Sequence, residues 1–238
     1  MIYYISKNSI KYNKSLKEIY LNIIDLNSRF LIQDLTINDW KIYLNSDNKI
    51  LSKKYQKLQS GCLSFYNVNF ENVSLYAKNT YCEDSINIIK SSGNISEILI
   101  SNSNSDSIDF DFSDISIQKI NITNSINDCI DFSFGNYIVN NIITKNCRDK
   151  SISAGENTKL TINNFIDEQS NISIAVKDSS DVSINELTSV GSEVCFSLFR
   201  KKQEFANSIL KINNLNHDCL VMNNYVQDKS LLMLNNEK

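Results

Sequence analysis

Aspartate residues recur at a fixed spacing in the middle of this chain. Asp84, Asp106 and Asp128 lie 22 residues apart. Asp109 and Asp131 form a second series with the same step. If successive repeats stack as parallel strands, the carboxylates of each series come within about 5 Å of each other. Like charges that close raise each other's pKa or bind a cation. Two carboxyl groups about 5–5.5 Å apart can also hydrolyse a glycosidic bond with retention of configuration.

We consider three roles for these acidic residues. The candidates for catalysis are Asp106, Asp128, Asp109 and Asp131. The candidate Ca²⁺ ligands are Asp109, Asp131 and the nearby Asp111. Ca²⁺ takes six to eight oxygen ligands, which two stacked columns, Asn side chains and water can supply. The third role is a solvated acidic face, since Asp also sits well at turns. Only the second role uses a metal, so we expect no obligatory cofactor.

A group of basic residues follows the acidic series. Lys150 continues the first series one step beyond Asp128, and residues 200–207 (RKKQEFAN) interrupt the repeat with a basic segment. Insertions in repeat proteins often form binding loops, so we expect these cations to bind an anionic sugar or a partner. The candidate ligand-binding residues are Lys150, Lys177, Arg200, Lys201 and Lys202. The alternative is a solvated loop with Phe205 packed against the core.

The six cysteines show no C-x-x-C spacing, and the chain has one histidine, so we do not expect a zinc site. On the 22-residue repeat, one column that we expect to face outward contains Cys129, Ser151, Ser173, Cys195 and Cys219. Cys195 and Cys219 would lie on adjacent repeats, close enough for a disulfide. Cys62 and Cys82 are a second candidate pair. Free, solvent-facing or half-buried thiols are the alternative. His217 lies far from the acidic series, and we expect it at a turn.

All of these placements depend on an internal repeat. Short segments with alternating apolar residues recur every 22 residues, and their apolar anchors are Ile86, Ile108, Ile130, Ile152, Ile174 and Phe196. A second apolar series contains Ile98, Ile120, Ile142, Ile162 and Ile184, and an Asn series contains Asn102, Asn124 and Asn146. With a two-residue offset after Phe196, we expect Leu220 to continue the first series and Asn214 to continue the Asn series.

A fixed period with strand-like alternation inside each unit predicts an all-β solenoid, a single-stranded parallel β-helix with about 22 residues per coil. The composition agrees, since 34 Ile favour strands while 35 Asn and 33 Ser favour turns. A leucine-rich repeat has a similar period. However, Asn124 comes one residue too early after Ile117 for that pattern, and the return segment alternates with period two instead of helical spacing.

We expect one structural domain. Residues 83–225 form its regular coils, and residues 26–82 form irregular earlier coils with an insertion around residues 47–59. Residues 1–25 fit no coil well, and we expect them to cap the open N-terminal end, because an uncovered solenoid end invites edge pairing. Residues 226–238 form a C-terminal tail or cap.

Charge and hydropathy exclude several classes of function. The net charge is −3 and the isoelectric point is about 5.3, which argues against a nucleic-acid-binding protein. No apolar run approaches the roughly 18 residues of a membrane helix, so we expect no membrane insertion. The first nine residues, MIYYISKNS, lack the basic start and continuous apolar stretch of a signal peptide.

Three consecutive repeats carry segments that resemble the N-T-D, D-D, G-H-G and R-I-K motifs of polygalacturonases. The segments are Asn104-Ser105-Asp106, Asn127-Asp128, Asp149-Lys150-Ser151 and, one coil later, Ala175-Val176-Lys177. From at least residue 83 to residue 222, the coils resemble the right-handed parallel β-helix superfamily, the pectate-lyase-like group that binds or cleaves polysaccharides. This resemblance implies a right-handed helix and a location outside the cytoplasm or at the cell surface. It places Asp106 and Asp128 on family carboxylates and Lys177 on the substrate-binding lysine.

Three positions depart from the polygalacturonase pattern. Asn127 replaces an aspartate, Lys150 replaces the histidine, and Ala175 replaces the arginine. With these groups missing, little remains to stabilise a glycosyl transition state. We therefore expect a non-catalytic protein that binds a polysaccharide or a cell-surface component. The alternatives are a degenerate polysaccharide hydrolase or lyase that uses the stacked Asp residues, and a purely structural spacer.

Overall fold

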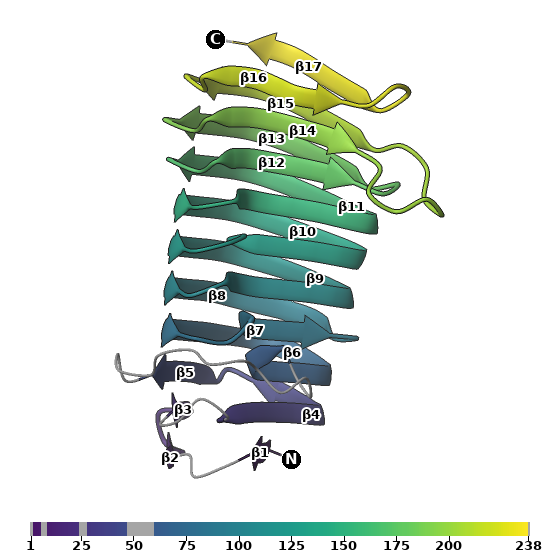
Figure 1. Cartoon of the computed structure of the whole chain (residues 1–238). Helices are drawn as coiled ribbons and strands as arrows, with labels where there is room; N and C mark the ends of the chain where they lie inside the picture. The colour runs from purple at the N-terminus through teal and green to yellow at the C-terminus, as the bar shows by residue number, and fades with distance from the viewer. Residues whose placement is uncertain (1, 6–8, 24–27, 47–59, 238) are drawn as a thin grey trace.

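Stacked coils of β-strand make up the chain (Figure 1). The computed structural model describes residues 2–5, 9–23, 28–46 and 60–237. These residues contain no helix and form a parallel β-solenoid of about nine turns, with about 22 residues per turn. None of them belongs to a helix long and apolar enough to cross a membrane. The predicted all-β parallel β-helix is confirmed.

The described residues form one sheet of 17 strands that winds around the axis of the solenoid. The first strands are β1 (Ile2–Ile5), β2 (Ser9–Asn13), β3 (Glu18–Ile23), β4 (Arg29–Asn38) and β5 (Lys41–Ser46). The middle strands are β6 (Gly61–Thr80), β7 (Asp84–Ile89), β8 (Ser92–Ser103), β9 (Asp106–Ser125), β10 (Ile130–Cys147) and β11 (Lys150–Glu168). The last strands are β12 (Ile172–Lys177), β13 (Asp181–Val190), β14 (Val194–Phe199), β15 (Ile209–His217), β16 (Val221–Val226) and β17 (Leu231–Glu237).

Pairing between coils is parallel except at the N-terminal end. There, β1 pairs antiparallel with β4, and β2 pairs antiparallel with β3. β3 also pairs in parallel with β5, so coil stacking begins within the segment that we expected to be a cap. At the other end, β17 pairs in parallel with β15, so stacking continues into the expected tail. The insertion expected around residues 47–59 lies outside the described residues.

The apolar repeat forms the core, as predicted. Ile130 pairs with Ile108 on one side and with Ile152 on the other, and Ile174 and Phe196 continue the column. All five side chains are fully buried. Two residues further along each coil, the rings of Phe110 and Phe132 stack with their centroids 5.0 Å apart. Each coil therefore buries its apolar side chains against the equivalent side chains of its neighbours.

A ladder of asparagines marks one turn of each middle coil. The amide of Asn124 donates to the Oδ1 of Asn102 at 3.0 Å, and the amide of Asn146 donates to the Oδ1 of Asn124 at 2.9 Å. The three residues have φ values of 59°, 62° and 56°. Asn tolerates this left-handed conformation better than most residues, so the same residue type serves both the turn and the ladder. The predicted Asn stack is confirmed.

The predicted register is wrong in three places. Ile142 pairs with Phe165, 23 residues later, whereas the prediction assumed a shorter step of 20 residues to Ile162, which pairs with Val139. The turn at Glu156 and Asn157 lengthens this coil by one residue, where the prediction had shortened it by two. Asn214 pairs with Glu186 and does not continue the Asn ladder.

The third difference lies after the insertion. Leu220 is 83% exposed and does not continue the apolar column. Phe196 pairs with Asn223, so the insertion is longer than the sequence pattern indicated. Met222 and Val226 pack against the core in this last part of the chain.

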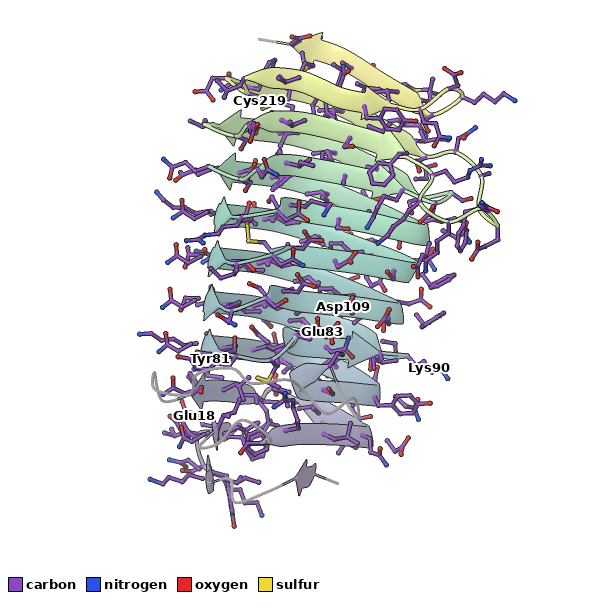
Figure 2. The ribbon with its side chains drawn as sticks, viewed as in Figure 1. Glu18, Tyr81, Glu83, Lys90, Asp109 and Cys219 are labelled. Atoms are coloured by element: carbon purple, nitrogen blue, oxygen red, sulfur yellow. A yellow bond between two sulfur atoms is a disulfide. The ribbon has the colours of Figure 1, made fainter. Side chains whose placement is uncertain are left out.

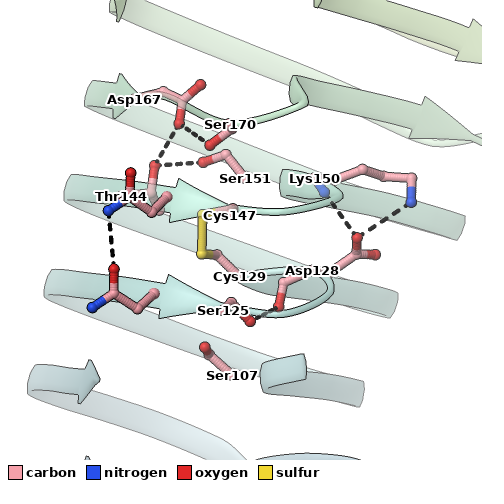
Figure 3. Close-up of a disulfide and its surroundings, with 12 residues drawn as sticks. Ser107, Ser125, Asp128, Cys129, Thr144, Cys147, Lys150, Ser151, Asp167 and Ser170 are labelled. Carbon is pink, nitrogen blue, oxygen red and sulfur yellow. Dashed lines mark hydrogen bonds and ion pairs between the residues drawn. A yellow bond between two sulfur atoms is a disulfide. The ribbon is translucent and has the colours of Figure 1, made fainter. Parts of the chain in front are cut away.

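Every cysteine in the chain is in a disulfide. The pairs are Cys62–Cys82, Cys129–Cys147 and Cys195–Cys219. Cys129 lies just before β10 and Cys147 is the last residue of β10, so the bond closes one coil at the corner where the next coil begins (Figure 3). Two of the three pairs were candidates from the sequence, whereas Cys129–Cys147 was not anticipated. The free-thiol interpretation is wrong.

The column that contains these cysteines does not face outward, which corrects the sequence prediction. Cys129, Ser151, Ser173 and Cys195 are fully buried. They point into the corner of the coil, where small polar residues face each other. The hydroxyl groups of Ser85 and Ser103, for example, lie 2.8 Å apart. Ser85 and Ser103 are separated by the same 18 positions as Cys129 and Cys147, so a hydrogen bond closes one coil where a disulfide closes another.

Changing Ile130 to Asp tests the core column. The substitution buries a charge with no partner, so we expect the free energy of unfolding to fall by several kcal/mol. Ile138 on the same strand is 60% exposed, so Ile138→Asp is the matched control and should change stability by about 0.5 kcal/mol or less. Chemical denaturation measures both. Equal losses in the two variants would contradict the assignment of inward and outward columns.

The double variant Cys129→Ser/Cys147→Ser tests the corner disulfide. The two hydroxyl groups can reproduce the Ser85–Ser103 hydrogen bond, so the variant should fold. It should lose about 2–4 kcal/mol of unfolding free energy, because the cross-link no longer restricts the unfolded chain. Denaturation with and without a reductant measures the loss. If the variant is as stable as the oxidised parent, this disulfide does not stabilise the coil.

Candidate functional site

Two columns of aspartate lie close together on the solenoid: Asp109 and Asp131 are half-buried, whereas Asp84 and Asp128 of the other column are buried. Ile108 and Phe110 point inward on β9. Side chains alternate along a strand, so Asp109, which lies between them, and Asp111, which follows Phe110, point outward. The strand register places Asn87, Asp109, Asp131 and Ser153 directly above one another. The other column contains Asp84, Asp106 and Asp128. We call Asp84, Asp106, Asp109, Asp111, Asp128 and Asp131 the acidic cluster.

The first column binds the backbone of the following coil. Asp106 accepts hydrogen bonds from the Nδ2 of Asn127 at 2.7 Å and from the backbone N–H of Asp128 at 2.8 Å. Asp128 accepts from the backbone N–H of Lys150 at 3.0 Å and from its Nζ at 3.2 Å (Figure 3). These carboxylates cap the start of the next strand, which gives Asp106 and Asp128 a structural role beside the catalytic one expected from the sequence.

The second column has polar atoms without partners. The Nδ2 of Asn87 donates to Asp109 at 3.0 Å and to Asp111 at 3.4 Å. Among the described residues, however, no group pairs with the buried Oδ1 of Asn87, the Oδ1 of Asp131 or the Oγ of Ser153. Asn87 is 1% exposed and Ser153 is fully buried. Buried polar atoms without partners are rare in proteins and often mark the place of a ligand, an ion or ordered water.

Burial and mutual repulsion keep protons on this cluster. Burial raises the pKa of Asp109 well above its usual range, and the charges of Asp111, Asp84 and Asp131 raise it further. Burial also raises the pKa of Asp111, while its hydrogen bonds with Asn87 and Asp109 oppose the rise. Asp109 and Asp111 therefore both hold their protons to higher pH than exposed aspartates do, and the two groups titrate together.

The first column is also shifted. Burial raises the pKa of Asp84 to about 7, with a smaller contribution from the charge of Asp106. Burial raises the pKa of Asp128 to about 7, although the positive charge of Lys150 opposes the rise. Near neutral pH the face therefore carries both hydrogen-bond donors (protonated carboxyl groups) and acceptors (carboxylates). A cation such as Ca²⁺ could instead be held by the carboxylates of Asp109, Asp111 and Asp131 together with the Oδ1 of Asn87.

A pocket of about 430 Å³ continues the same face toward the N-terminus. Its lining includes Leu31, Ser64 and Asn87, which belong to the column that leads to Asp109. Tyr66 and Ile89 line its other side. Asn87 thus connects the pocket with the acidic cluster, so a long ligand could contact both.

The structure does not bring the five predicted cationic residues into one site. Lys150 pairs with Asp128 and Asp149 inside the acidic face. Lys202 pairs with Glu156, and Lys177 is buried beside Gly155.

The remaining cations belong to an exposed loop. Arg200 and Lys201 are exposed, and the backbone N–H groups of Lys201 and Lys202 donate to Asp178, which anchors the loop. Phe205 is half-buried, with its ring centroid 6.0 Å from that of Phe134 on the surface.

Several polar and aromatic residues near this face were not predicted as site residues from the sequence. Asn87 and Ser153 occupy the ends of the second Asp column, but their unpaired atoms depend on details of packing. Phe112 and Phe134 follow the outward residues Asp111 and Ser133, and the repeated pattern D-F-x-F at residues 109–112 and 131–134 was a visible signal for them.

A buried carboxylate elsewhere in the core was also missed. Asp167 is fully buried and accepts hydrogen bonds from Ser170 at 2.5 Å and Thr144 at 3.1 Å (Figure 3). It also accepts a hydrogen bond from Ser192 at 2.7 Å. These hydroxyl groups satisfy the carboxylate within the protein, so it is a structural network. Cys195, His217 and Cys219 also lie close together, but the two sulfur atoms are bonded to each other and offer no thiolate to a metal.

The raised carboxyl pKa values predict how stability depends on pH. Between the unfolded pKa of Asp84 and its folded value of about 7, the folded state binds more protons than the unfolded state. Stability contributed by protonation is therefore lost as pH rises from about 4 to about 7. Asp84→Asn should flatten this dependence, whereas Glu193→Gln, at an exposed position, should not. Denaturation at several pH values tests both variants, and a parent protein that gains stability between pH 5 and 8 would contradict the shifts.

Comparison with known proteins adds no relative to this description. No protein-family model, no curated protein and no solved structure matched the chain.

Proposed function

We propose that this chain is a non-catalytic β-helix protein whose acidic cluster, with the neighbouring Asn87 and Ser153, binds a polysaccharide. The observation that carries the proposal is the row of buried polar atoms without partners at Asn87, Asp131 and Ser153. A ligand that displaced the neighbouring side chains and bonded to these atoms would remove the cost of leaving them unpaired. The row follows the solenoid axis, so the ligand that fits it is long and carries repeated polar groups.

Carbohydrate fits this surface better than other polymers. A sugar chain presents closely spaced hydroxyl groups, each of which donates and accepts hydrogen bonds. The acidic cluster offers a matching set of donors and acceptors, because burial raises the pKa of Asp84 and Asp128 to about 7, so near neutral pH each exists in both the protonated and the ionised form. A nucleic acid would meet repulsion from the same carboxylates. The resemblance to pectate-lyase-like β-helices points to the same class of ligand.

The disulfides support a location outside the reducing cytoplasm. All six cysteines are paired, and disulfides persist mainly in secreted, periplasmic or surface proteins. An oxidising location is where a protein would meet extracellular or cell-surface polysaccharide.

Hydrolysis is the second candidate function, and one observation favours it. Burial raises the pKa of both Asp109 and Asp111, and Asp131 lies one coil away from Asp109, about 4.8 Å along the axis. One protonated carboxyl group and one neighbouring carboxylate are the two groups that a retaining glycosidase needs. Binding without turnover remains the main proposal, because the face has no histidine and its cation Lys150 is already paired.

Ser153→Ala and Asp131→Asn test the binding face. Ser153→Ala removes a hydroxyl group that has no partner among the described residues. Asp131→Asn replaces the carboxylate, whose Oδ1 has no such partner, by a neutral amide of the same size, so the melting temperature should not fall in either variant. Affinity for the polysaccharide should fall about tenfold or more in each variant. Isothermal titration against neutral, amino and uronic-acid oligosaccharides measures the affinity, with Ca²⁺ and with a chelator.

The control is Ser46→Ala, which removes another buried hydroxyl group without a partner, on β5. It should leave affinity unchanged. Binding that survives both Ser153→Ala and Asp131→Asn would place the ligand elsewhere. If the chelator alone abolishes binding or lowers the melting temperature, the acidic cluster is a cation site.

Asp109→Asn tests the hydrolytic alternative. If the Asp109–Asp111 pair supplies the catalytic acid, the variant should keep its fold and lose turnover by several powers of ten. Assays for new reducing ends and for unsaturated products cover hydrolysis and elimination, and circular dichroism checks the fold. If the parent protein cleaves none of the glycans that it binds, the hydrolytic alternative fails.

A further inference from the structure

The third disulfide differs from the other two in having one sulfur atom near the surface. The four cysteines of the other two disulfides are buried, whereas Cys219 is half-buried and is bonded to the fully buried Cys195. Cys219 lies just after β15, near the C-terminal end of the solenoid and several coils along the axis from Asp109 (Figure 2). A reducing thiol can therefore reach this bond, at Cys219, more readily than it reaches the other two.

The single histidine of the chain lies beside this disulfide. One ring nitrogen of His217 and the sulfur atoms of Cys195 and Cys219 lie within 4.8 Å of one another. His217 ends β15 and pairs in the strand register with Ser189 of β13, whose hydroxyl oxygen lies 3.3 Å from the Sγ of Cys219. Three side chains that bind metal ions through nitrogen or sulfur therefore meet at one corner of the solenoid.

The contacts of the imidazole ring leave one of its nitrogen atoms available. The Nε2 of His217 lies 3.4 Å from the Oε1 of Glu237 on β17. The Nδ1 is buried and has no hydrogen-bond partner among the residues that the structure describes. With the Nε2 hydrogen directed at Glu237, the lone pair of the ring lies on Nδ1. A carboxylate placed behind a histidine in this way is usual at metal sites, where it fixes the orientation of the ring and strengthens the nitrogen ligand.

We propose that reduction of the Cys195–Cys219 disulfide opens a Zn²⁺ site formed by the two thiolates and the Nδ1 of His217. This site goes beyond the polysaccharide binding proposed above and does not depend on it. Zn²⁺ binds this combination of sulfur and nitrogen ligands tetrahedrally, about 2.3 Å from sulfur and about 2.0–2.1 Å from nitrogen. Among the described residues, no further cysteine or carboxylate joins the three ligand atoms. Water therefore takes the fourth position, as at other zinc sites with three protein ligands.

The backbone around Cys219 allows the disulfide to become a metal site. Two thiolates on one tetrahedral Zn²⁺ lie about 3.8 Å apart, so the two sulfur atoms must move apart once their bond is broken. Cys195 is held within β14, whereas Cys219 lies between β15 and β16 and belongs to neither strand. The Cys219 side chain can therefore turn while the pairing of β14 with β16 stays in place.

The redox step uses a dithiol reductant. One thiolate of the reductant attacks the Sγ of Cys219, forms a mixed disulfide and releases the thiolate of Cys195. The second thiol of the reductant then attacks the reductant's own sulfur in the mixed disulfide, which releases the thiolate of Cys219, and the reductant leaves as a cyclic disulfide. Two electrons pass to the protein, and the two thiol protons pass to solvent when Zn²⁺ binds the thiolates. The metal ion stabilises only the reduced form, so the metal and the reductant favour the same state.

Titration with Co²⁺, a spectroscopic substitute for Zn²⁺, tests the site. The whole chain is treated with a soluble dithiol until one disulfide opens, separated from the reductant without oxygen, titrated with Co²⁺ and then titrated with Zn²⁺. The reduced parent should bind about one ion per chain and show thiolate-to-cobalt charge-transfer absorption with the visible bands of a tetrahedral site. Zn²⁺ should remove both signals, and the oxidised parent should show neither.

Four variants separate the ligands from the rest of the molecule. His217→Ala should weaken binding to the reduced chain about 100-fold or more, because a ligand is lost, and Glu237→Gln should weaken it about tenfold. Cys195→Ser/Cys219→Ser should abolish the absorption bands, and the oxidised parent gives the same comparison without a substitution. The matched control Cys129→Ser/Cys147→Ser removes a disulfide that has no histidine beside it and should leave the affinity unchanged.

Alkylation with mass spectrometry identifies the disulfide that opens first, and circular dichroism follows the fold. We expect Cys195 and Cys219 to be alkylated before the other cysteines, with the β-sheet signal retained. Earlier opening of another disulfide, or loss of the fold when this one opens, would overturn the proposal. So would equal Co²⁺ affinity of the reduced parent and reduced His217→Ala, because the histidine would then not be a ligand. None of these results bears on polysaccharide binding, which is measured on the oxidised protein.

Discussion

Hydrogen bonds between successive coils hold each residue directly over the residue about 22 positions earlier in the chain. This register places equivalent residues of successive coils next to each other. An interaction between two residues of one type is therefore repeated from coil to coil along the axis. Isoleucines gain from the stacking because they bury one another, and asparagines gain because each amide donates to the next. Aspartates lose from it, because like charges repel. The acidic face is therefore the one part of the repeat that works against the stability of the stack.

Spacing alone was enough to predict the fold, the inward Ile column, the Asn ladder and the alignment of the Asp columns. All of them repeat in the regular part of the chain, where a fixed period translates directly into contact. Prediction failed where a coil changes length. The extra residue at Glu156 and Asn157 makes the step 23 residues, so Phe165 pairs with Ile142 where a shortened coil ending at Ile162 was predicted, and the longer insertion leaves Leu220 exposed. A single residue added in a turn has little effect on the local sequence pattern but displaces everything after it.

The candidate site could be predicted only in part from the sequence, and the reason is not a change in coil length. Alternation assigns each residue to the inside or the outside of a strand, but it does not describe the corners. The alternating pattern predicted that Cys129 faces outward, because it directly precedes the inward Ile130. At the corner of the coil, however, Cys129 and both of its neighbours, Asp128 and Ile130, are buried. Likewise, the unpaired atoms of Asn87 and Ser153 depend on where neighbouring side chains point. The Phe112 ring is displayed because its backbone is left-handed, which a strand pattern does not reveal.

The third disulfide has a consequence for the integrity of the chain. Cys195 and Cys219 lie on either side of the exposed loop at residues 200–207, whose first three residues are Arg200, Lys201 and Lys202. Basic residues in an exposed loop are favoured points of cleavage by trypsin-like proteases. A cut there would leave two fragments joined through sulfur, with β15 still hydrogen-bonded to β13. In an oxidising, protease-rich environment, the nicked molecule would remain a single covalent particle, and after reduction only the pairing and packing between coils would hold its two fragments together.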